Sequence, residues 1–335
     1  MTVTLREVAA AAGVSIKTVS NVINGYAHIS ARTREAVEKA VADLGYQPNL
    51  SARGLRSGRT GAIGLVIPDL KNPYFAELAG SVMRAASQHG LAVFVEQTGG
   101  DRAQELAVLA SPRMRMADGI LFSVTGLDQA DAATVAFPVT TVLLGERIFG
   151  AGADHVTMKN VEAARAATEH LIELGRSRIV ALGARPHEVS GSAGLRLRGY
   201  REALEAAGIP FRDELVVDAT PWHRADGARA VRELLAAGTG FDAVFAFNDT
   251  LAFGAMRALG DAGLGVPRDV AIIGFDDVDE ARYSMPALTS IDPGRDEIAE
   301  TAVRLLAARI GGDSTEPFVL HEAAFRIVTR ESTGG

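Results

Sequence analysis

Polar side chains follow two apolar segments whose composition is typical of buried strands. Asn248 and Asp249 follow the segment AVFAF, and Asp276 and Asp277 follow the segment AIIGF. Hydrogen-bond donors and acceptors that gather just beyond strand ends are what a hydroxyl-rich small ligand requires. Asp249 and Asp277 also fit a second role, because aspartate is a favoured N-cap of a helix.

The single tryptophan of the chain, Trp222, stands in the polar stretch TPWH between a predicted strand and a predicted helix. A flat apolar face at such a place suits stacking on a sugar ring or a heterocycle. The alternative is a hydrophobic lid over the end of the helix. With the Asn and Asp pairs, Trp222 indicates reversible binding of a small molecule.

Patterns typical of catalysis are missing from the sequence. It has no Walker phosphate loop, no GxGxxG after a strand, no HExxH helix and no GxSxG elbow. The seven histidines are scattered and cysteine is absent, so no metal-ligand spacing arises. We therefore expect no enzyme, no catalytic residue, no metal and no cofactor.

The segment LREVAAAAGVSIKTVS, which begins at Leu5, has the features of a helix-turn-helix. Such a unit needs small residues where its helices cross, a glycine in the turn and apolar residues that pin the second helix. The residues that meet these needs are Ala9, Gly13, Val14, Val19 and Val22. Pinning that face leaves an outward face that can meet base edges and phosphates, formed by Ser15, Ile16, Lys17, Ser20 and Asn21. The alternative is a small alanine-rich bundle with a solvated polar face.

Charge is unevenly distributed along the chain. Residues 1–60 carry eight Lys or Arg against four Asp or Glu, a net +4, whereas the remainder carries −11, which gives the total of −7. A basic head on an acidic body is expected when the head alone contacts a polyanion.

Three short helices are predicted in this basic head. Thr4 caps a helix over 5–12, with Glu7 completing a capping box, and Gly13 ends it. Ser15 caps a helix over 16–23, and Ser30 caps one over 31–44 that ends at Gly45.

The length of 335 residues fits two or three units of ordinary size. No uninterrupted apolar run is long enough for a membrane span, and the N-terminus does not resemble a signal peptide. Absence of cysteine agrees with a reducing compartment, so we expect a cytoplasmic protein without membrane contact.

From residue 61 onward, apolar strands alternate with amphipathic helices. The predicted strands are 62–68, 91–97, 119–124 and 139–145, then 178–183, 215–218, 243–248 and 270–275. The predicted helices are 76–89, 161–174, 193–207, 224–237 and 250–262. Continuous apolar strands with helical crossovers predict parallel sheets covered on both faces, and two series predict two lobes. A ligand of such sheets binds at the carboxyl ends of the strands, here in the crevice between the lobes.

The run from Val3 to Asn49, VTLREVAAAAGVSIKTVSNVINGYAHISARTREAVEKAVADLGYQPN, resembles the DNA-binding headpiece of the lactose/galactose repressor family, and later motifs follow in the family's order. The resemblance implies an all-α helix-turn-helix headpiece followed by an α/β two-lobed periplasmic-binding-protein-like domain with parallel sheets. The implied domains are a headpiece, 1–48, a hinge helix and linker, 49–60, and an effector-binding and dimerisation domain, 61–335. Lobe 1 would take about 61–160 plus 292–325, and lobe 2 about 161–291.

The same resemblance implies which residues contact DNA. Ile16, Lys17 and Asn21 stand where the family contacts bases in the major groove, although many members carry Arg at the Asn21 position. Leu55 of the hinge would enter the minor groove as an apolar wedge, next to Gly54, which weakens a helix. The other implied contacts are Thr4, Ser15, Thr18, Ser20, Asn24, Tyr26, His28 and Arg53.

The resemblance implies effector contacts in the second domain at Tyr74, Phe75, Arg196, Asn248 and Asp276, and the aromatic face of Trp222 adds a sixth candidate. The planar fork of Arg196 suits a carboxylate or a pair of sugar hydroxyls. Two departures are visible: Glu146 follows the fourth strand where many relatives have Asp, and Lys159-Asn160 stands in place of an Asp-Asn pair. Galactoside, pentoside and nucleobase effectors therefore all stay open.

We thus expect a sequence-specific DNA-binding transcriptional regulator, a repressor whose operator affinity is controlled by a small sugar-like effector. It would act as a homodimer on a pseudo-palindromic operator. A tetramer assembled through a C-terminal coiled coil is not expected, because no heptad repeat follows the second domain. The alternative is a sugar-binding receptor of the periplasmic type without a DNA function.

Overall fold

In the computed structural model of the chain, the described residues are 3–23, 26, 28–46, 59–312 and 316–334. They form two compact units, Met1–Thr60 and Gly61–Gly335. None of the described helices is long and apolar enough to cross a membrane.

The first unit holds three helices with the bounds that the capping residues predict: α1 Leu5–Ala12, α2 Ile16–Ile23 and α3 Ala31–Leu44. The capping box of α1 is formed, because the Thr4 amide donates to Glu7 Oε2 at 2.7 Å and the Glu7 amide donates to Thr4 Oγ1. Gly13 adopts φ 65°, a left-handed conformation that lets the chain turn sharply into α2.

A small apolar core joins these helices. One valine from each helix is fully buried: Val8, Val19 and Val37. Since Val19 and Val22 both face this core, the opposite side of α2 faces away from it.

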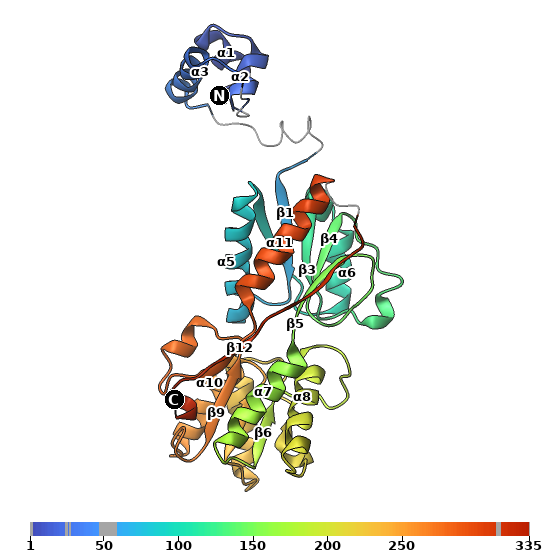
Figure 1. Cartoon of the computed structure of the whole chain (residues 1–335), viewed down its shortest axis with the longest axis vertical. Coiled ribbons are helices and arrows are strands. Elements are labelled where there is room, and N and C mark those ends of the chain that lie inside the picture. Colours follow the sequence, from blue (N-terminus) through green and yellow to red (C-terminus); the bar gives the residue numbers. More distant parts are fainter. Residues whose placement is uncertain (1–2, 24–25, 27, 47–58, 313–315, 335) are drawn as a thin grey trace. The chain divides into compact units, whose positions relative to one another are not determined.

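The second unit consists of two α/β lobes, each built around one sheet (Figure 1). The first sheet has the order β11-β5-β4-β3-β1-β2, and the second has the order β12-β10-β9-β8-β6-β7. The strands of the first sheet are β1 Ala62–Ile67, β2 Ala92–Gln97, β3 Gly119–Ser123, β4 Thr140–Leu144, β5 Asp154–Met158 and β11 Leu320–Ala323. Those of the second are β6 Ile179–Leu182, β7 Val216–Val217, β8 Ala243–Ala246, β9 Ala271–Phe275, β10 Thr289–Asp292 and β12 Arg326–Val328.

The prediction of parallel sheets is confirmed, with one exception at an edge. All neighbouring strands of the first sheet are parallel. In the second sheet, β12 pairs antiparallel with β10 and the other pairs are parallel.

Helices cover both faces of each sheet. In the first lobe α5 and α11 pack on one face and α6 on the other. In the second lobe α7 and α8 pack on one face, and α9 and α10 on the other. The helices are α5 Pro73–Gln88, α6 Arg102–Ala110, α7 Asn160–Glu173, α8 Ser192–Ala206, α9 Arg224–Ala236, α10 Asp249–Asp261 and α11 Arg295–Gly311. Short 3₁₀ turns are η1 Met114–Met116, η2 Gln129–Asp131, η3 Asp213–Leu215, η4 Asp279–Arg282 and η5 Glu331–Thr333.

The chain crosses between the lobes three times, after β5, after β10 and after β11 (Figure 1). The elements at these crossings, β5, β10, α11, β11 and β12, were not predicted, and neither was α6. Thr289 and Ser290 of β10 show why: both are buried although polar, so their segment lacks the apolar signature of a strand.

Candidate functional site

A cavity of about 530 Å³ opens at the carboxyl ends of the strands, between the two lobes. Loops that follow β1, β3 and β4 line it from one lobe, and loops that follow β8 and β9 line it from the other. All six predicted effector contacts line this one cavity: Tyr74, Phe75, Arg196, Trp222, Asn248 and Asp276.

Asp276 is an acidic group of the second lobe that lines the cavity. Its side chain belongs to a residue only 5% exposed, and its backbone has φ 114°. Within residues 59–312 and 316–334, no group donates a hydrogen bond to its carboxylate, whose oxygens are open to the cavity. Burial raises the pKa of Asp276 to about 7, against the opposing effect of Arg196 and Arg295. The carboxylate can therefore accept a hydrogen bond from a molecule in the cavity.

Arg196, on α8, is 3% exposed and is held on several sides. Its Nε donates to Asn160 Oδ1 at 2.8 Å, and its Nη1 donates to the carbonyl oxygen of Phe247. The guanidinium also lies 3.5 Å from the ring centroid of Phe275. Burial lowers the pKa of Arg196, partly offset by the nearby carboxylates. Its remaining group, Nη2, has a single weak contact with the Met158 sulfur at 3.8 Å, so it can donate to a ligand.

Trp222 lines the cavity with its N–H engaged by the protein, and the guanidinium groups of Arg185 and Arg196 lie 5.9 and 5.7 Å from its ring centroid. The indole Nε1 donates to the carbonyl oxygen of Gly183 at 2.9 Å, which fixes the ring from one edge. The Trp222 backbone has φ 74°, and its carbonyl oxygen accepts from Thr250 Oγ1 at 2.6 Å and from Asn248 Nδ2 at 3.2 Å. These bonds hold a strained backbone in place beside the cavity.

Asn248 lines the cavity, but its amide is already engaged by protein groups. Its Oδ1 accepts from the Leu251 amide at 2.9 Å, so Asn248 is the N-cap of α10. Asp249, for which the sequence suggested this cap, is instead the first helical residue and is fully buried. Asp277 is not a helix cap either, because its carboxylate pairs with Arg330 at 2.6 Å. The two aspartates were misread because their partners, Ser290 and Arg330, are distant in sequence.

Tyr74 and Phe75 lie in the first turn of α5, where Asn72 is the N-cap and Pro73 begins the helix. Their rings make an edge-to-face contact at 5.1 Å between centroids. Tyr74 is buried, and burial raises the pKa of its hydroxyl, which therefore stays a neutral donor. Phe75 is half-buried and offers the cavity an apolar edge.

Polar contacts between the lobes border the same cavity, and sequence reasoning missed most of them. Glu146, after β4, accepts from Ser192 Oγ at 2.8 Å, and Glu188 pairs with Arg147 at 3.0 Å. Glu188 also pairs with Arg185 of its own lobe at 3.0 Å. Glu146 was noticed only as a departure from the family's Asp, and nothing in the sequence links it to the loop 185–192.

The charges that line the cavity are balanced. The acidic members are Asp69, Glu146, Glu188 and Asp276, and the basic members are Lys71, Arg147, Arg185 and Arg196. The three arginines already contact carboxylate, carbonyl or amide oxygens of the protein. The arrangement suits a neutral ligand with many hydroxyl groups better than an anion.

In the first unit, α2 turns Ile16, Lys17, Ser20 and Asn21 to the side opposite its buried valines. Ile16 is 39% exposed although apolar, which leaves its side chain available for contact. Ser15 caps α2, since the Thr18 amide donates to Ser15 Oγ at 3.1 Å. The other predicted DNA contacts described here, Thr4, Tyr26 and His28, are exposed. Asn24, Arg53 and Leu55, with the predicted hinge helix, lie outside the described residues.

A helix-turn-helix unit in one chain with a two-lobed α/β unit, whose cavity lies between the lobes at the strand ends, defines a ligand-responsive DNA-binding regulator. The comparisons with known proteins agree with this class. The chain belongs to the lacI family of bacterial regulatory proteins: the family's model matches residues 4–49, and a periplasmic binding protein-like domain matches residues 168–333.

Relatives match nearly the whole chain. The HTH-type transcriptional regulator CelR of Thermobifida fusca is 37% identical over 322 residues, which cover 94% of each chain. A solved regulator of the LacI family from Sanguibacter keddieii is 48% identical, with TM-score 0.77, over 83% of this chain and 100% of that one. A solved CelR–cellobiose complex is 32% identical with TM-score 0.71, over 98% and 99% of the two chains. The lac repressor dimer bound to operator and an anti-inducer is 29% identical with TM-score 0.81, over 99% of each. The chain is thus a DNA-binding transcriptional regulator of this family.

Proposed function

We propose that the protein is a homodimeric repressor whose affinity for a pseudo-palindromic operator is set by a neutral, sugar-like effector bound between the lobes. The observation that carries the effector assignment is the buried Asp276 carboxylate, which faces the cavity without a hydrogen-bond donor from the described residues. Relatives solved with cellobiose and with operator DNA support the same function.

In the cavity, Asp276 accepts from effector hydroxyls and Arg196 donates to an effector oxygen. Phe75 and Trp222 contact the apolar faces of the sugar ring. Because the charged groups of the cavity balance, sugar acids and sugar phosphates bind more weakly than neutral sugars.

On DNA, α2 lies in the major groove with Ile16, Lys17 and Asn21 toward the bases. Asn21 suits adenine, Lys17 suits guanine or phosphate, and Ile16 suits a thymine methyl. The capped N-terminus of α2, at Ser15 and Thr18, faces a phosphate, where helix amides favour an anion. The lac repressor dimer on its operator supports two such headpieces per site.

The two sites are coupled through closure of the lobes. Contacts across the cavity, such as Ser192–Glu146 and Arg147–Glu188, exist when the lobes are close together. An effector that contacts both lobes favours the closed arrangement. The difference between its binding free energies for the closed and the open arrangement is the free energy available to change operator binding. Such coupling is typically about 1–3 kcal/mol and is reciprocal.

The proposal is tested by selecting a binding site for the full chain from random duplex DNA. We expect a palindrome that is bound with a steep salt dependence. Cellobiose is the first effector to add, and emission of Trp222, the single tryptophan, reports its binding directly. No enriched sequence, together with firm sugar binding, would instead support the sugar-receptor alternative.

A further inference from the structure

The turn that places Asp276 in the cavity is strained. Asp276 has φ 114° and Asp277 has φ 45°, so two consecutive residues other than glycine have positive φ. Such backbone is unfavourable for L-residues and persists only where the surroundings hold it. The groups that hold this turn therefore control where the Asp276 carboxylate points.

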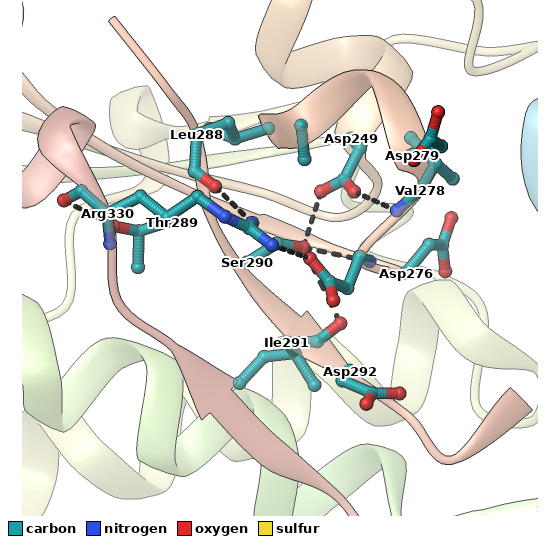
Figure 2. A network of polar contacts seen from close by, with 12 residues as sticks. Asp249, Asp276, Val278, Asp279, Leu288, Thr289, Ser290, Ile291, Asp292 and Arg330 are labelled. Carbon is teal, nitrogen blue, oxygen red and sulfur yellow. Dashed lines mark hydrogen bonds and ion pairs between the residues drawn. The ribbon is translucent and has the colours of Figure 1, made fainter. Parts of the chain in front are cut away.

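Three consecutive amides of the turn donate to groups behind it. The Asp276 amide donates to the Ile291 carbonyl oxygen at 2.8 Å, and the Asp277 amide donates to Ser290 Oγ at 3.1 Å. The Val278 amide donates to Asp249 Oδ2 at 2.9 Å. Ser290 in turn donates to Asp249 Oδ1 at 2.6 Å, which joins these contacts into one network (Figure 2).

Arg330, from the C-terminal segment, completes the network from its far side (Figure 2). Its Nη2 donates to Asp277 Oδ1 at 2.6 Å, and its Nη1 donates to the Leu288 carbonyl oxygen at 2.7 Å. The Arg330 amide also donates to Thr289 Oγ1 at 2.8 Å. The Arg330 and Asp277 side chains are 13% and 7% exposed, so the ion pair is largely shielded from water.

We infer that Arg330 is a positioning residue for the effector: it fixes the Asp277 side chain, and thereby holds the Asp276 carboxylate in the cavity. The inference rests on the proposed function, in which Asp276 binds the effector. Removing Arg330 leaves the Asp277 carboxylate buried and uncompensated, which is strongly unfavourable. The turn then relaxes to let Asp277 reach water, and Asp276 loses its direction.

Arg326 provides a matched control in the same segment. It pairs with Asp292 at 2.9 Å, but its side chain is 73% exposed and Asp292 does not line the cavity. Arg326→Met therefore removes an arginine ion pair a few residues away without touching the turn. Arg330→Lys keeps the charge but cannot contact both Asp277 and Leu288 as the arginine fork does.

The first test titrates the full-length protein with cellobiose and follows Trp222 emission. We expect about tenfold weaker binding for Arg330→Met, a smaller loss for Arg330→Lys and none for Arg326→Met, with operator affinity in the absence of sugar retained. In an Asp276→Asn background, Arg330→Met should add little, because the residue it positions has been removed. A loss of thermal stability without a change in sugar affinity, or a full additional loss in the Asp276→Asn background, would overturn the inference.

A second test does not depend on the identity of the sugar. Crystal structures of wild type, Arg330→Lys and Arg330→Met without ligand should show the turn relaxed in the Met variant, with the Asp276 carboxylate turned out of the cavity. If Arg330→Met does not fold, the crystal structure of Arg330→Lys provides the test. We expect the Asp276 carboxylate to be displaced in that variant. If the wild-type protein does not bind cellobiose, only the proposed effector is contradicted. An unchanged turn in every folded variant would contradict the role of Arg330.

Discussion

Ser192 and Glu146 join the two lobes directly: the Ser192 hydroxyl donates to Glu146 Oε2 at 2.8 Å across the border of the cavity. Glu146 stays oriented because Thr157 Oγ1, from its own lobe, donates to Oε1 at 3.2 Å. The pair is thus a contact of the closed arrangement, and its removal should favour opening.

Ser192→Ala should weaken effector binding by about tenfold, since a hydrogen bond to a charged group contributes about 1.5–3 kcal/mol. Calorimetric titration with cellobiose measures the change. Arg198→Ala, on the same helix with a surface partner at Glu202, is the control and should bind as wild type does. Equal affinities for Ser192→Ala and wild type would mean that closure does not depend on this contact.

Effector binding should depend on pH through Asp276, whose pKa burial raises to about 7. Effector hydroxyls donate to the ionised carboxylate, so affinity should rise through this pH and be about tenfold weaker at pH 6 than at pH 8. The folded state binds the extra proton between the ordinary pKa of Asp and about 7, so this group's contribution to stability falls as pH rises through that window. Asp276→Asn should abolish this component of the pH dependence; a profile identical to that of wild type would show that another group titrates.

Trp222→Ala should weaken effector binding by roughly tenfold, because an aromatic stacking partner contributes about 0.5–1.5 kcal/mol beyond its buried area. Calorimetry is the suitable measurement, since the variant lacks its tryptophan. Phe211→Ala removes an aromatic ring of the same lobe that contacts Tyr200 and Arg201 and does not line the cavity. If both variants lose affinity equally, the loss reports stability of the lobe and not stacking on the ligand.

Lys17→Ala with Asn21→Ala should weaken operator binding by about 1–3 kcal/mol for each side chain that reads a base, and should leave effector binding intact. Fluorescence anisotropy with the selected operator measures this change. Lys39→Ala removes an exposed cation of α3 that pairs with Asp43, and serves as the control for charge alone. An equal effect of the two changes would indicate general electrostatic attraction in place of base recognition.

The sequence predicts local features of this protein well. The bounds of α1, α2 and α3 follow from their caps, and Thr4 with Glu7 forms the expected capping box. The residues predicted to contact the effector line one cavity because strand ends of parallel sheets meet at one edge.

What the sequence did not predict depends on contacts between distant segments. Thr289 can be buried in a strand because Ser332 and Arg330, some forty residues further on, form hydrogen bonds with it. Ser290 is buried beside it because its hydroxyl contacts Asp249 and the Asp277 amide. Asp249 supports the turn through its contact with Ser290, and Glu146 joins the lobes through its contact with Ser192. None of these pairs leaves a periodic signal in the sequence, so they become visible only in the fold.

Control of the DNA site by the effector site is best tested by measuring linkage in both directions. Operator affinity is measured with and without saturating cellobiose, and cellobiose affinity with and without saturating operator. We predict that both affinities change by the same factor, about 5–150-fold, and that Asp276→Asn reduces this effect of added cellobiose while operator affinity without sugar is kept. Sugar that binds the cavity and leaves operator affinity unchanged would contradict this coupling.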